Sequence, residues 1–511
     1  MAQNDNNKRI AKNTMLLYFR MILTMLVSLY TVRIVLNTLG TVDFGIYSVV
    51  GGIVTLFAFL SSSMASASLR FFAYELGRND IEQLKKTFSM TMTIYIMIAV
   101  IILVFAETIG LWILNTQMTI PTERMAAAQM VYQFSIFSFM MTMFTIPYNA
   151  SIIAHENMKV YAYVSIIEVL LKLVIVYLLV LFSYDKLKLY AFLMFGVTGI
   201  VTLIYRTYCK RKFVECTYTY FWDKKLFKEI FSYSGWNLFS VIALALNTQG
   251  VNIILNSFFG PLVNASRGIA YQVNSAVDQF VQNFMTATRP QIIKYYSTGE
   301  NEKMLKLIFQ SSKLSFFLLF ILSMPILLET NYVFILWLKL VPDYAVIFTR
   351  LVIISLLINS LSYPLITGAQ ATGDIKKYQL TIGLVAFLNL PISYLFLKIG
   401  FPAQSVFFVT VVFSIIYLVL RLVLLKELIG LSRIAYLKEV ILPVSITATT
   451  AYIIPLIISN YLPESFLRFA IVVIIGFIIS IFSIFFIGMS LIERNMLKEQ
   501  MKKLSSKFLN K

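Results

Sequence analysis

The chain has 511 residues, of which 59% are hydrophobic and only 13% are charged, and its formal net charge is +19. This composition excludes an ordinary soluble globular protein. Apolar runs of about 20 residues, the length that crosses a bilayer core as a helix, recur along the sequence. Unbroken runs such as 469–488 exclude an outer-membrane barrel. We therefore predict an all-α polytopic membrane protein.

The first expected element is a retained membrane helix. The polar, basic segment 1–14 is followed by an apolar run without a small-residue cleavage site, and that run is too long for a signal-peptide core. In chain order we expect fourteen transmembrane helices. Their centres lie near residues 26, 56, 98, 138, 171, 197, 245, 276, 319, 356, 387, 414, 449 and 479.

Lys and Arg residues assign the two sides of the membrane. With the N-terminus in the cytoplasm, the cytoplasmic loops and termini carry 32 of the 43 Lys and Arg residues, the opposite loops carry six and the spans five. This asymmetry follows the positive-inside rule and predicts that both termini are cytoplasmic. The net charge then reflects topology and attraction to anionic lipid, and it does not indicate nucleic-acid binding.

The sequence predicts two copies of one six-helix unit. "LRFFAYELGRNDIEQLKKTF" (69–88) is similar to "TRPQIIKYYSTGENEKMLKLIF" (288–309), and "VRIVLN" (32–37) matches "VNIILN" (251–256) at the same offset of 219. Six spans return the chain to its starting side. The copies should therefore be parallel and related by an axis along the membrane normal.

The predicted organisation has five parts. They are an N-terminal six-helix lobe (1–207), a basic cytoplasmic linker (208–229), a C-terminal six-helix lobe (230–430), transmembrane helices 13 and 14 (431–490) and a basic tail (491–511). The tail has an apolar face among lysines, which is typical of a helix lying on a membrane surface. The only two cysteines, Cys209 and Cys216, fall in the linker, where we expect them to be reduced.

The expected eighth helix carries a long polar stripe. Steps of three and four from Arg267 follow one helical face. They meet Tyr271, Asn274, Asp278, Gln282, Met285 and Arg289. This stripe cannot face lipid, because a central charge alone costs about 2.5–3.5 kcal/mol on insertion. It lines either a water-filled cavity or a helix interface. The equivalent face of the second helix is small, hydroxyl-rich and ends at Arg70, and both interpretations stay open there too.

Other charges inside the spans have two interpretations each. Arg33, in the first helix, either contacts a substrate or extends to the headgroups. Glu168 and Lys172 stand four apart in the order that favours an intrahelical ion pair, so mutual neutralisation competes with a functional role. Asp278 is either a proton or cation coupling site or a local counter-charge to the arginines of its stripe.

The balance of charge favours an anionic substrate. The spans hold five cations but only two clearly internal acids, whereas a site for cationic drugs should be acid-dominated. Arg also binds phosphate through its planar fork. The sequence contains no glycine-rich phosphate loop and no catalytic constellation. We therefore expect no enzyme, cofactor or metal site, and we expect the only histidine, His155, to be a solvated loop residue.

Two stretches carry a resemblance to a known family. "LNTLGTVDFGIYSVV" (36–50) resembles the segment that joins helices 1 and 2 in polysaccharide-biosynthesis membrane proteins, and "RFFAYELGRND" (70–80) continues in the same register. The whole chain resembles Wzx-type flippases of the MATE-like superfamily, which also contains multidrug exporters and lipid II flippases. The resemblance implies two pseudo-symmetric six-helix bundles plus two C-terminal helices.

The resemblance also implies the substrate and its path. A flippase of this kind moves an undecaprenyl-pyrophosphate-linked oligosaccharide across the bacterial cytoplasmic (inner) membrane for O-antigen, capsule or other surface polysaccharide. The implied partners are this substrate, membrane lipids, H⁺ or Na⁺ as a coupling ion, and a polysaccharide polymerase with glycosyltransferases. Two alternatives stay open, an ion-coupled multidrug or metabolite exporter of the same fold and a scaffold for glycosyltransferases.

The resemblance implies that arginines and acids in the lumen contact the substrate, and we assign these roles here by position. We expect substrate contacts, to the pyrophosphate or to the cavity, at Arg33, Arg70, Arg267, Asn274, Gln282 and Arg289. We expect coupling-ion or counter-charge roles at Asp278, Glu168 and Lys172.

Overall fold

The computed structural model of the chain describes residues 2–55, 58–116, 120–182, 184–338, 341–491 and 493–495. Within these ranges some residues are described by their backbone alone. They are residues 2–8, 11, 29, 32, 33, 36, 37, 41, 42, 44, 45, 48, 49, 51–55, 58–60, 256, 261, 262 and 265. The predicted amphipathic tail, 491–511, lies outside the described residues except for 491 and 493–495.

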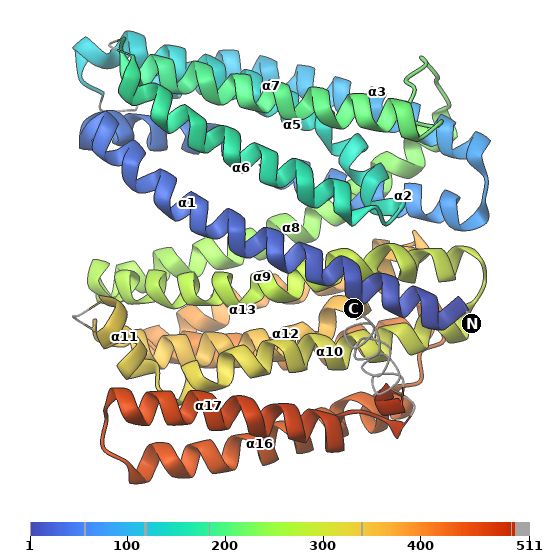
Figure 1. Cartoon of the computed structure of the whole chain (residues 1–511), viewed down its shortest axis with the longest axis vertical. Helices are drawn as coiled ribbons and strands as arrows, with labels where there is room; N and C mark the ends of the chain where they lie inside the picture. Colours follow the sequence, from blue (N-terminus) through green and yellow to red (C-terminus); the bar gives the residue numbers. More distant parts are fainter. Residues whose placement is uncertain are drawn as a thin grey trace, which may run out of the picture. The chain divides into compact units, whose positions relative to one another are not determined.

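The regular secondary structure of the described residues is all helical, as predicted (Figure 1). The helices of the first half are α1 (Ala2–Thr55), α2 (Ala58–Arg78), α3 (Ile81–Phe105), η1 (Ala106–Gly110), α4 (Leu111–Thr116), η2 (Thr122–Arg124), α5 (Met125–Ala154), α6 (Met158–Leu181) and α7 (Lys186–Lys212). Those of the second half are α8 (Lys224–Phe259), α9 (Pro261–Ser297), α10 (Asn301–Leu328), α11 (Thr330–Leu338), α12 (Ala345–Thr372), α13 (Lys376–Lys398), α14 (Ser405–Ile429), α15 (Arg433–Tyr436), η3 (Leu437–Ile441), α16 (Leu442–Tyr461), α17 (Phe466–Ser483) and η4 (Ile484–Gly488).

Eleven helices in the described part of the chain are long and apolar enough to cross a membrane. They coincide with eleven of the fourteen expected spans. The first and second expected spans lie in α1 and α2, where α1 bends at Gly40 with a φ of +79°. The eighth is α9, whose polar stripe lowers its hydropathy. The count of fourteen is compatible with this arrangement and stays a prediction.

The helices repeat along the chain at the offset that the sequence predicts. If both bounds of α5 are moved by the offset of 219, they match the bounds of α12 to within a single position. The first residue of α6 matches that of α13 equally well. Gly40 (φ +79°) and Gly260 (φ +77°), both with left-handed backbone conformations, are related in the same way and separate equivalent helices. Each glycine therefore interrupts the helix at the equivalent point of its copy. Glycine is suited to this position because residues with a side chain rarely adopt a positive φ.

The chain divides into two compact units. The N-unit comprises Ile10–Val241 and Ile293–Thr298. The C-unit comprises the described residues within Met1–Arg9, Ile242–Ile292 and Gly299–Lys511.

Equivalent helices occupy the centre of each unit. In the N-unit, α5 packs against α2, α3, α6 and α7, and in the C-unit α12 packs against α10, α11 and α14. Small residues such as Gly368 of α12 allow this close packing, because a Cβ there would lie 2.8 Å from the Ile308 side chain of α10. The two helices outside the repeat, α16 and α17, pack against each other and against α10 (Figure 1).

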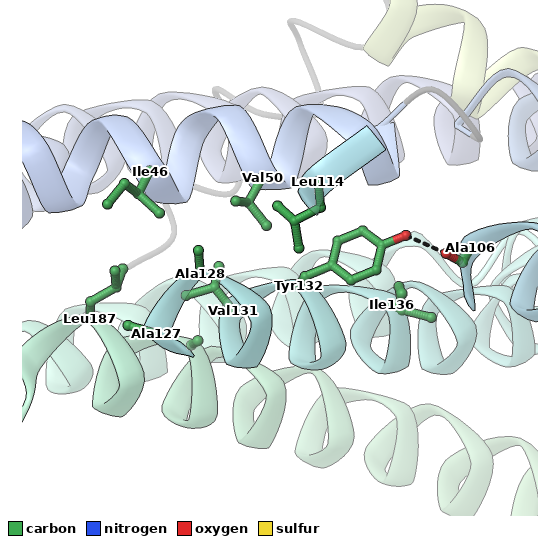
Figure 2. Close-up of a cluster of buried hydrophobic side chains, with 11 residues drawn as sticks. Ile46, Val50, Ala106, Leu114, Ala127, Ala128, Val131, Tyr132, Ile136 and Leu187 are labelled. Atoms are coloured by element: carbon green, nitrogen blue, oxygen red, sulfur yellow. Dashed lines mark hydrogen bonds between the residues drawn. The ribbon is translucent and has the colours of Figure 1, made fainter. Parts of the chain in front are cut away.

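One core cluster of the N-unit shows how its helices are held (Figure 2). Ile46 and Val50 of α1 pack with residues of α4, α5 and α7. Tyr132 of α5 is fully buried and donates a hydrogen bond to the Ala106 carbonyl oxygen at 2.7 Å. Gly110 makes room for this ring, since a Cβ there would lie 1.9 Å from the Tyr132 hydroxyl.

The end of α2 approaches the last turn of α9 closely within the N-unit. A Cβ at Gly77 would lie 1.8 Å from the Ser297 Oγ and 3.0 Å from the Lys294 Cα. Gly77→Val should therefore destabilise the protein by about 1–3 kcal/mol, the usual cost of overpacking, as measured by thermal unfolding of the purified protein. Gly196→Val is the matched control, because a Cβ there meets nothing within 4 Å. Equal losses in both variants would contradict the prediction.

Candidate functional site

The C-unit encloses a polar cavity of about 320 Å³ between α8, α9, α12, α13 and α14. Four amide side chains line it: Asn247, Asn274, Asn359 and Asn389. The helices around it other than α9 are largely apolar and carry exposed Leu, Ile or Phe side chains. A polar lining within such a bundle avoids the cost of placing these groups against hydrocarbon.

The polar stripe of α9 forms one wall of the cavity. Asp278 accepts hydrogen bonds from the Tyr363 hydroxyl of α12 at 2.8 Å and from the Gln282 Nε2 at 3.3 Å. The Arg289 Nη2 donates to the Gln282 Oε1 at 3.2 Å. These contacts form a chain from the cavity to the partly buried guanidinium of Arg289. In the described part of the protein, no group of three or more His, Cys, Asp or Glu is placed to hold a metal ion.

The opposite wall comes from α12 and α14. The Ser355 and Ser414 hydroxyls lie 2.6 Å apart, and the Asn359 Nδ2 donates to the Ser414 Oγ at 3.1 Å. Arg421 lines the same wall, its Nε donates to the Tyr378 hydroxyl at 3.2 Å, and only 7% of the residue is exposed.

This second wall was not predicted from the sequence, although a signal was present. Ser355, Asn359 and Tyr363 recur every four residues along α12, which places them on one helical face. This period does not stand out in the sequence, because Ser360 and Ser362 place further polar residues on other faces of the helix.

The expected substrate contacts of α9 separate into two groups. Asn274 lines the cavity together with Asp278, whereas Gln282 and Arg289 join it through hydrogen bonds. Arg267 is 7% exposed, its Nη2 donates to the Thr248 carbonyl oxygen at 2.8 Å, and its guanidinium lies 4.4 Å from the Tyr271 ring centroid. Arg267 therefore anchors α9 to α8.

In the N-unit, Arg70 is packed among aromatic rings. It is 6% exposed, and its guanidinium lies 4.5 Å from the Phe71 ring centroid, 4.8 Å from that of Tyr74 and 5.9 Å from that of Tyr233. Such cation–π contacts stabilise a buried guanidinium. Tyr233 belongs to α8, so Arg70 joins α2 to the first turns of α8.

The remaining sequence-predicted residues also lie in the N-unit helices. The Lys172 Nζ and Glu168 Oε1 lie 2.6 Å apart, and this ion pair has the spacing that favours mutual neutralisation. Each side chain is a little over one third exposed. The side chain of Arg33 lies outside the described residues.

The linker before α8 folds back onto the turn between α5 and α6. The His155 ring stacks on Phe213 with centroids 4.1 Å apart, and its Nε2 lies 2.5 Å from the Glu215 Oε1. His155 lies in a turn, as expected of a loop residue, but it is only partly exposed and contacts Glu215 and Phe213. The sequence did not indicate these contacts, because the residues are about 60 positions apart along the chain. Cys209 and Cys216 are both buried and free.

In another part of the N-unit, Arg124 forms ion pairs with two carboxylates and so connects α1 to the start of α7. The Arg124 guanidinium lies 2.5 Å from Asp43 and 2.9 Å from Asp185 at its shortest contacts. Partial burial raises the pKa of Asp185, but hydrogen bonds from Arg124 and from backbone amides lower it by more. The pKa of Asp185 is therefore below its ordinary value.

This ion-paired carboxylate predicts a pH dependence. Because its pKa is lower in the folded than in the unfolded chain, the stability it contributes is present above the ordinary Asp pKa of about 3.9 and is lost as the pH falls through the folded value. Arg124→Ala should lower the melting temperature at pH 7, and the difference from wild type should shrink below pH 4. Lys186→Ala, at an exposed neighbour, is the control. A constant difference between pH 7 and pH 3 would contradict the assignment.

The model of the family described as polysaccharide biosynthesis protein matches residues 10–296, more than half of the chain. The chain belongs to the polysaccharide biosynthesis protein family. Among curated proteins, no sequence matches this member of the polysaccharide biosynthesis protein family.

Solved structures of MATE transporters share the fold of this polysaccharide biosynthesis protein. An outward-facing multidrug resistance MATE family transporter of the MOP superfamily is 13% identical, with a TM-score of 0.70, over 83% of this chain and 96% of its own. A MATE in the bent conformation is 13% identical, with a TM-score of 0.70, over 87% and 98%. The MATE transporter ClbM in complex with Rb⁺ is 15% identical, with a TM-score of 0.68, over 84% and 96%. The polysaccharide biosynthesis protein therefore has the MATE-like fold.

Proposed function

We propose that the chain is a flippase for undecaprenyl-pyrophosphate-linked oligosaccharide repeat units. It moves them from the cytoplasmic to the periplasmic leaflet of the bacterial cytoplasmic membrane, by alternating access, for surface polysaccharide such as O-antigen. The observation that carries this proposal is the family match over residues 10–296. Its physical support is a polar cavity held within an apolar helical bundle of transporter fold.

The chemistry of the substrate explains why such a protein is needed. A pyrophosphate bearing sugars cannot cross hydrocarbon unaided, because each ion or hydroxyl stripped of water costs several kcal/mol. A polar passage removes that cost, while the polyprenyl tail stays in lipid. Transporters built from parallel repeats bind their substrate between the halves and move one half against the other. No bond changes, so the flippase needs no catalytic group and no cofactor.

Arg289 is our first choice for the pyrophosphate contact. Its guanidinium already belongs to the hydrogen-bond chain that starts at Asp278, and Gln282 orients it. Planar guanidinium groups bind phosphate oxygens in pairs. Arg267 and Arg70, which pack on tyrosine rings, and Arg33 are candidates for further phosphate contacts.

Asp278 is proposed as the coupling site for H⁺ or Na⁺. It is the only acid among the described residues that line the cavity, and a carboxylate between neutral donors can take up or release a cation as the protein changes state. In the N-unit, Glu168 and Lys172 act as counter-charges to each other. In this scheme both termini are cytoplasmic, glycosyltransferases supply the substrate, and a polymerase consumes it.

The proposal is tested in the strain that carries the gene. Deletion should abolish surface polysaccharide and accumulate the lipid-linked repeat unit, and wild type should restore both. Arg289→Ala should fail to restore them at normal membrane levels, whereas Arg211→Ala, at an exposed residue, should succeed. Normal polysaccharide on deletion, with new sensitivity to cationic compounds, would instead support an exporter. Full activity of Arg289→Ala would remove the proposed headgroup contact.

A further inference from the structure

We propose that the C-unit cavity is a saccharide-binding subsite that recognises one neutral sugar of the transported repeat unit. The inference rests on the proposed function and deepens it, because it separates sugar recognition from pyrophosphate binding. The residues that carry it are Asn247 of α8, Asn274 of α9, Asn359 of α12 and Tyr417 of α14.

The charge of the cavity argues against a phosphate as its occupant. Among the described lining residues there is one acid, Asp278, and one base, Arg421, so the lining is neutral overall. The Arg421 guanidinium is already engaged, since its Nε donates to the Tyr378 hydroxyl and its centre lies 5.6 Å from the Tyr417 ring centroid. A pyrophosphate would bring uncompensated negative charge into a buried site. A neutral ligand would not.

The polar lining matches a ligand with many hydroxyl groups. Amide side chains offer both donors and an acceptor. The side chains of Asn247 and Asn274 line the cavity and make no hydrogen bond to another residue within the described part of the chain. They are therefore available to a ligand. Vicinal hydroxyls of a sugar present the same mixture of donors and acceptors.

A buried hydroxyl supplies an independent observation. Tyr417 lines the cavity and is 7% exposed, and its hydroxyl has no hydrogen-bond partner among the described residues. Buried polar groups in folded proteins are almost always paired, so this one calls for a partner from the cavity. A sugar hydroxyl would satisfy it. The rings of Tyr271, Tyr363 and Tyr417 add apolar faces against which the C–H face of a sugar can pack.

The size of the cavity fits a small polar ligand. Its volume of about 320 Å³ lies near the lower end of the range of about 300–1,000 Å³ for small-molecule sites. A single sugar residue fits this volume, whereas a polyprenyl chain is far too long for it. The competing occupant of the cavity is a cation bound at Asp278, which already accepts hydrogen bonds from Tyr363 and Gln282. The experiment below therefore includes a cation.

The experiment uses the full-length protein in lipid nanodiscs. Saturation-transfer NMR and calorimetry are recorded with glucose, galactose and N-acetylglucosamine, and with the oligosaccharide released by mild acid from the strain's own lipid-linked pool. We expect saturable binding of that oligosaccharide or one of the sugars. Tyr417→Phe, which removes only the hydroxyl, and Asn359→Leu should weaken it at least tenfold, and Asn460→Leu, on an exposed face of α16, should leave it unchanged.

A parallel assay separates this inference from the proposed function. In reconstituted vesicles, Tyr417→Phe should raise the half-saturating concentration of lipid-linked substrate and leave the maximal rate close to wild type. If neither sugars nor the oligosaccharide bind, and NaCl alone raises the melting temperature, the cavity is a cation site and the inference is overturned. Wild-type half-saturation in Tyr417→Phe and Asn359→Leu, with Arg289→Ala inactive, would overturn the subsite and keep the flippase. No flipping by wild type would overturn both.

Discussion

Asp278→Ala is expected to lower transport at least tenfold without lowering the amount of protein in the membrane. The carboxylate accepts hydrogen bonds from Tyr363 and Gln282, and its loss leaves both donors without their acceptor. A hydrogen bond to a charged group is worth about 1.5–3 kcal/mol, and each 1.4 kcal/mol corresponds to about a tenfold change. The rate is measured with labelled substrate in reconstituted vesicles.

Asp278→Asn distinguishes the two roles that the sequence leaves open. An Asn can still accept the hydrogen bond from Tyr363, but it cannot bind and release a proton. We expect it to be as inactive as the Ala variant and to have lost its dependence on a proton or sodium gradient. Transport close to wild type in Asp278→Asn would reduce Asp278 to a local counter-charge. Asp374→Ala, at an exposed acid between α12 and α13, is the control.

Glu156→Ala is expected to destabilise the protein by about 3 kcal/mol, at the lower end of the cost of breaking a buried ion pair. Glu156 lies in the turn between α5 and α6, its side chain is 1% exposed, and its Oε1 lies 2.9 Å from the Lys294 Nζ at the end of α9. Its backbone oxygen also accepts a hydrogen bond from the Asn13 side chain of α1. Removing one partner of a buried ion pair costs about 3–5 kcal/mol, because it leaves the other charge uncompensated. The lower figure applies because Lys294 is 21% exposed.

A double-mutant cycle measures this ion pair directly. Thermal or denaturant unfolding is followed for Glu156→Gln, Lys294→Met and the double variant, all in the same detergent. The double variant should be much less destabilised than the sum of the two singles. The pair Glu82–Lys86, in which the acid is 81% exposed, is the matched control and should contribute less than about 1 kcal/mol. Additive losses at Glu156 and Lys294 would contradict the assignment.

The fold followed closely from patterns that repeat along the chain. Eleven apolar runs reappear as helices long enough to span a membrane, because hydrocarbon imposes one length and one composition on each span. The offset between the two copies reappears in the bounds of α5 and α12 and in the backbone of Gly40 and Gly260. Equivalent sequence at equivalent positions gives equivalent helices.

The candidate site was only half predictable. The α9 stripe indicated Asn274 and Asp278 because its polar residues are dense enough to show a helical period. The facing residues on α12 and α14 are sparse, and which helices face each other is a tertiary fact that no local pattern contains. Met285, also on the predicted stripe, is fully buried. One helical face can line a cavity over part of its length and pack against neighbouring helices over the rest.

The arginines show the same limit more sharply. An arginine within an apolar run signals that something polar or aromatic lies opposite, but the sequence does not say which. For Arg70 the answer is three aromatic rings, and for Arg267 it is a backbone carbonyl and one tyrosine ring. For Arg289 it is a hydrogen-bond chain to the cavity. Residue type alone therefore predicted the chemistry of these positions and not their partners.

The central claim is tested most directly by reconstituting the purified protein in liposomes with a fluorescent undecaprenyl-pyrophosphate-linked saccharide. A membrane-impermeant quencher reports how much of the label moves from the inner to the outer leaflet. The account predicts rapid transfer with wild-type protein and transfer at the rate of empty liposomes with Arg289→Ala. Equal transfer rates for wild type and empty liposomes, at verified protein incorporation, would contradict it.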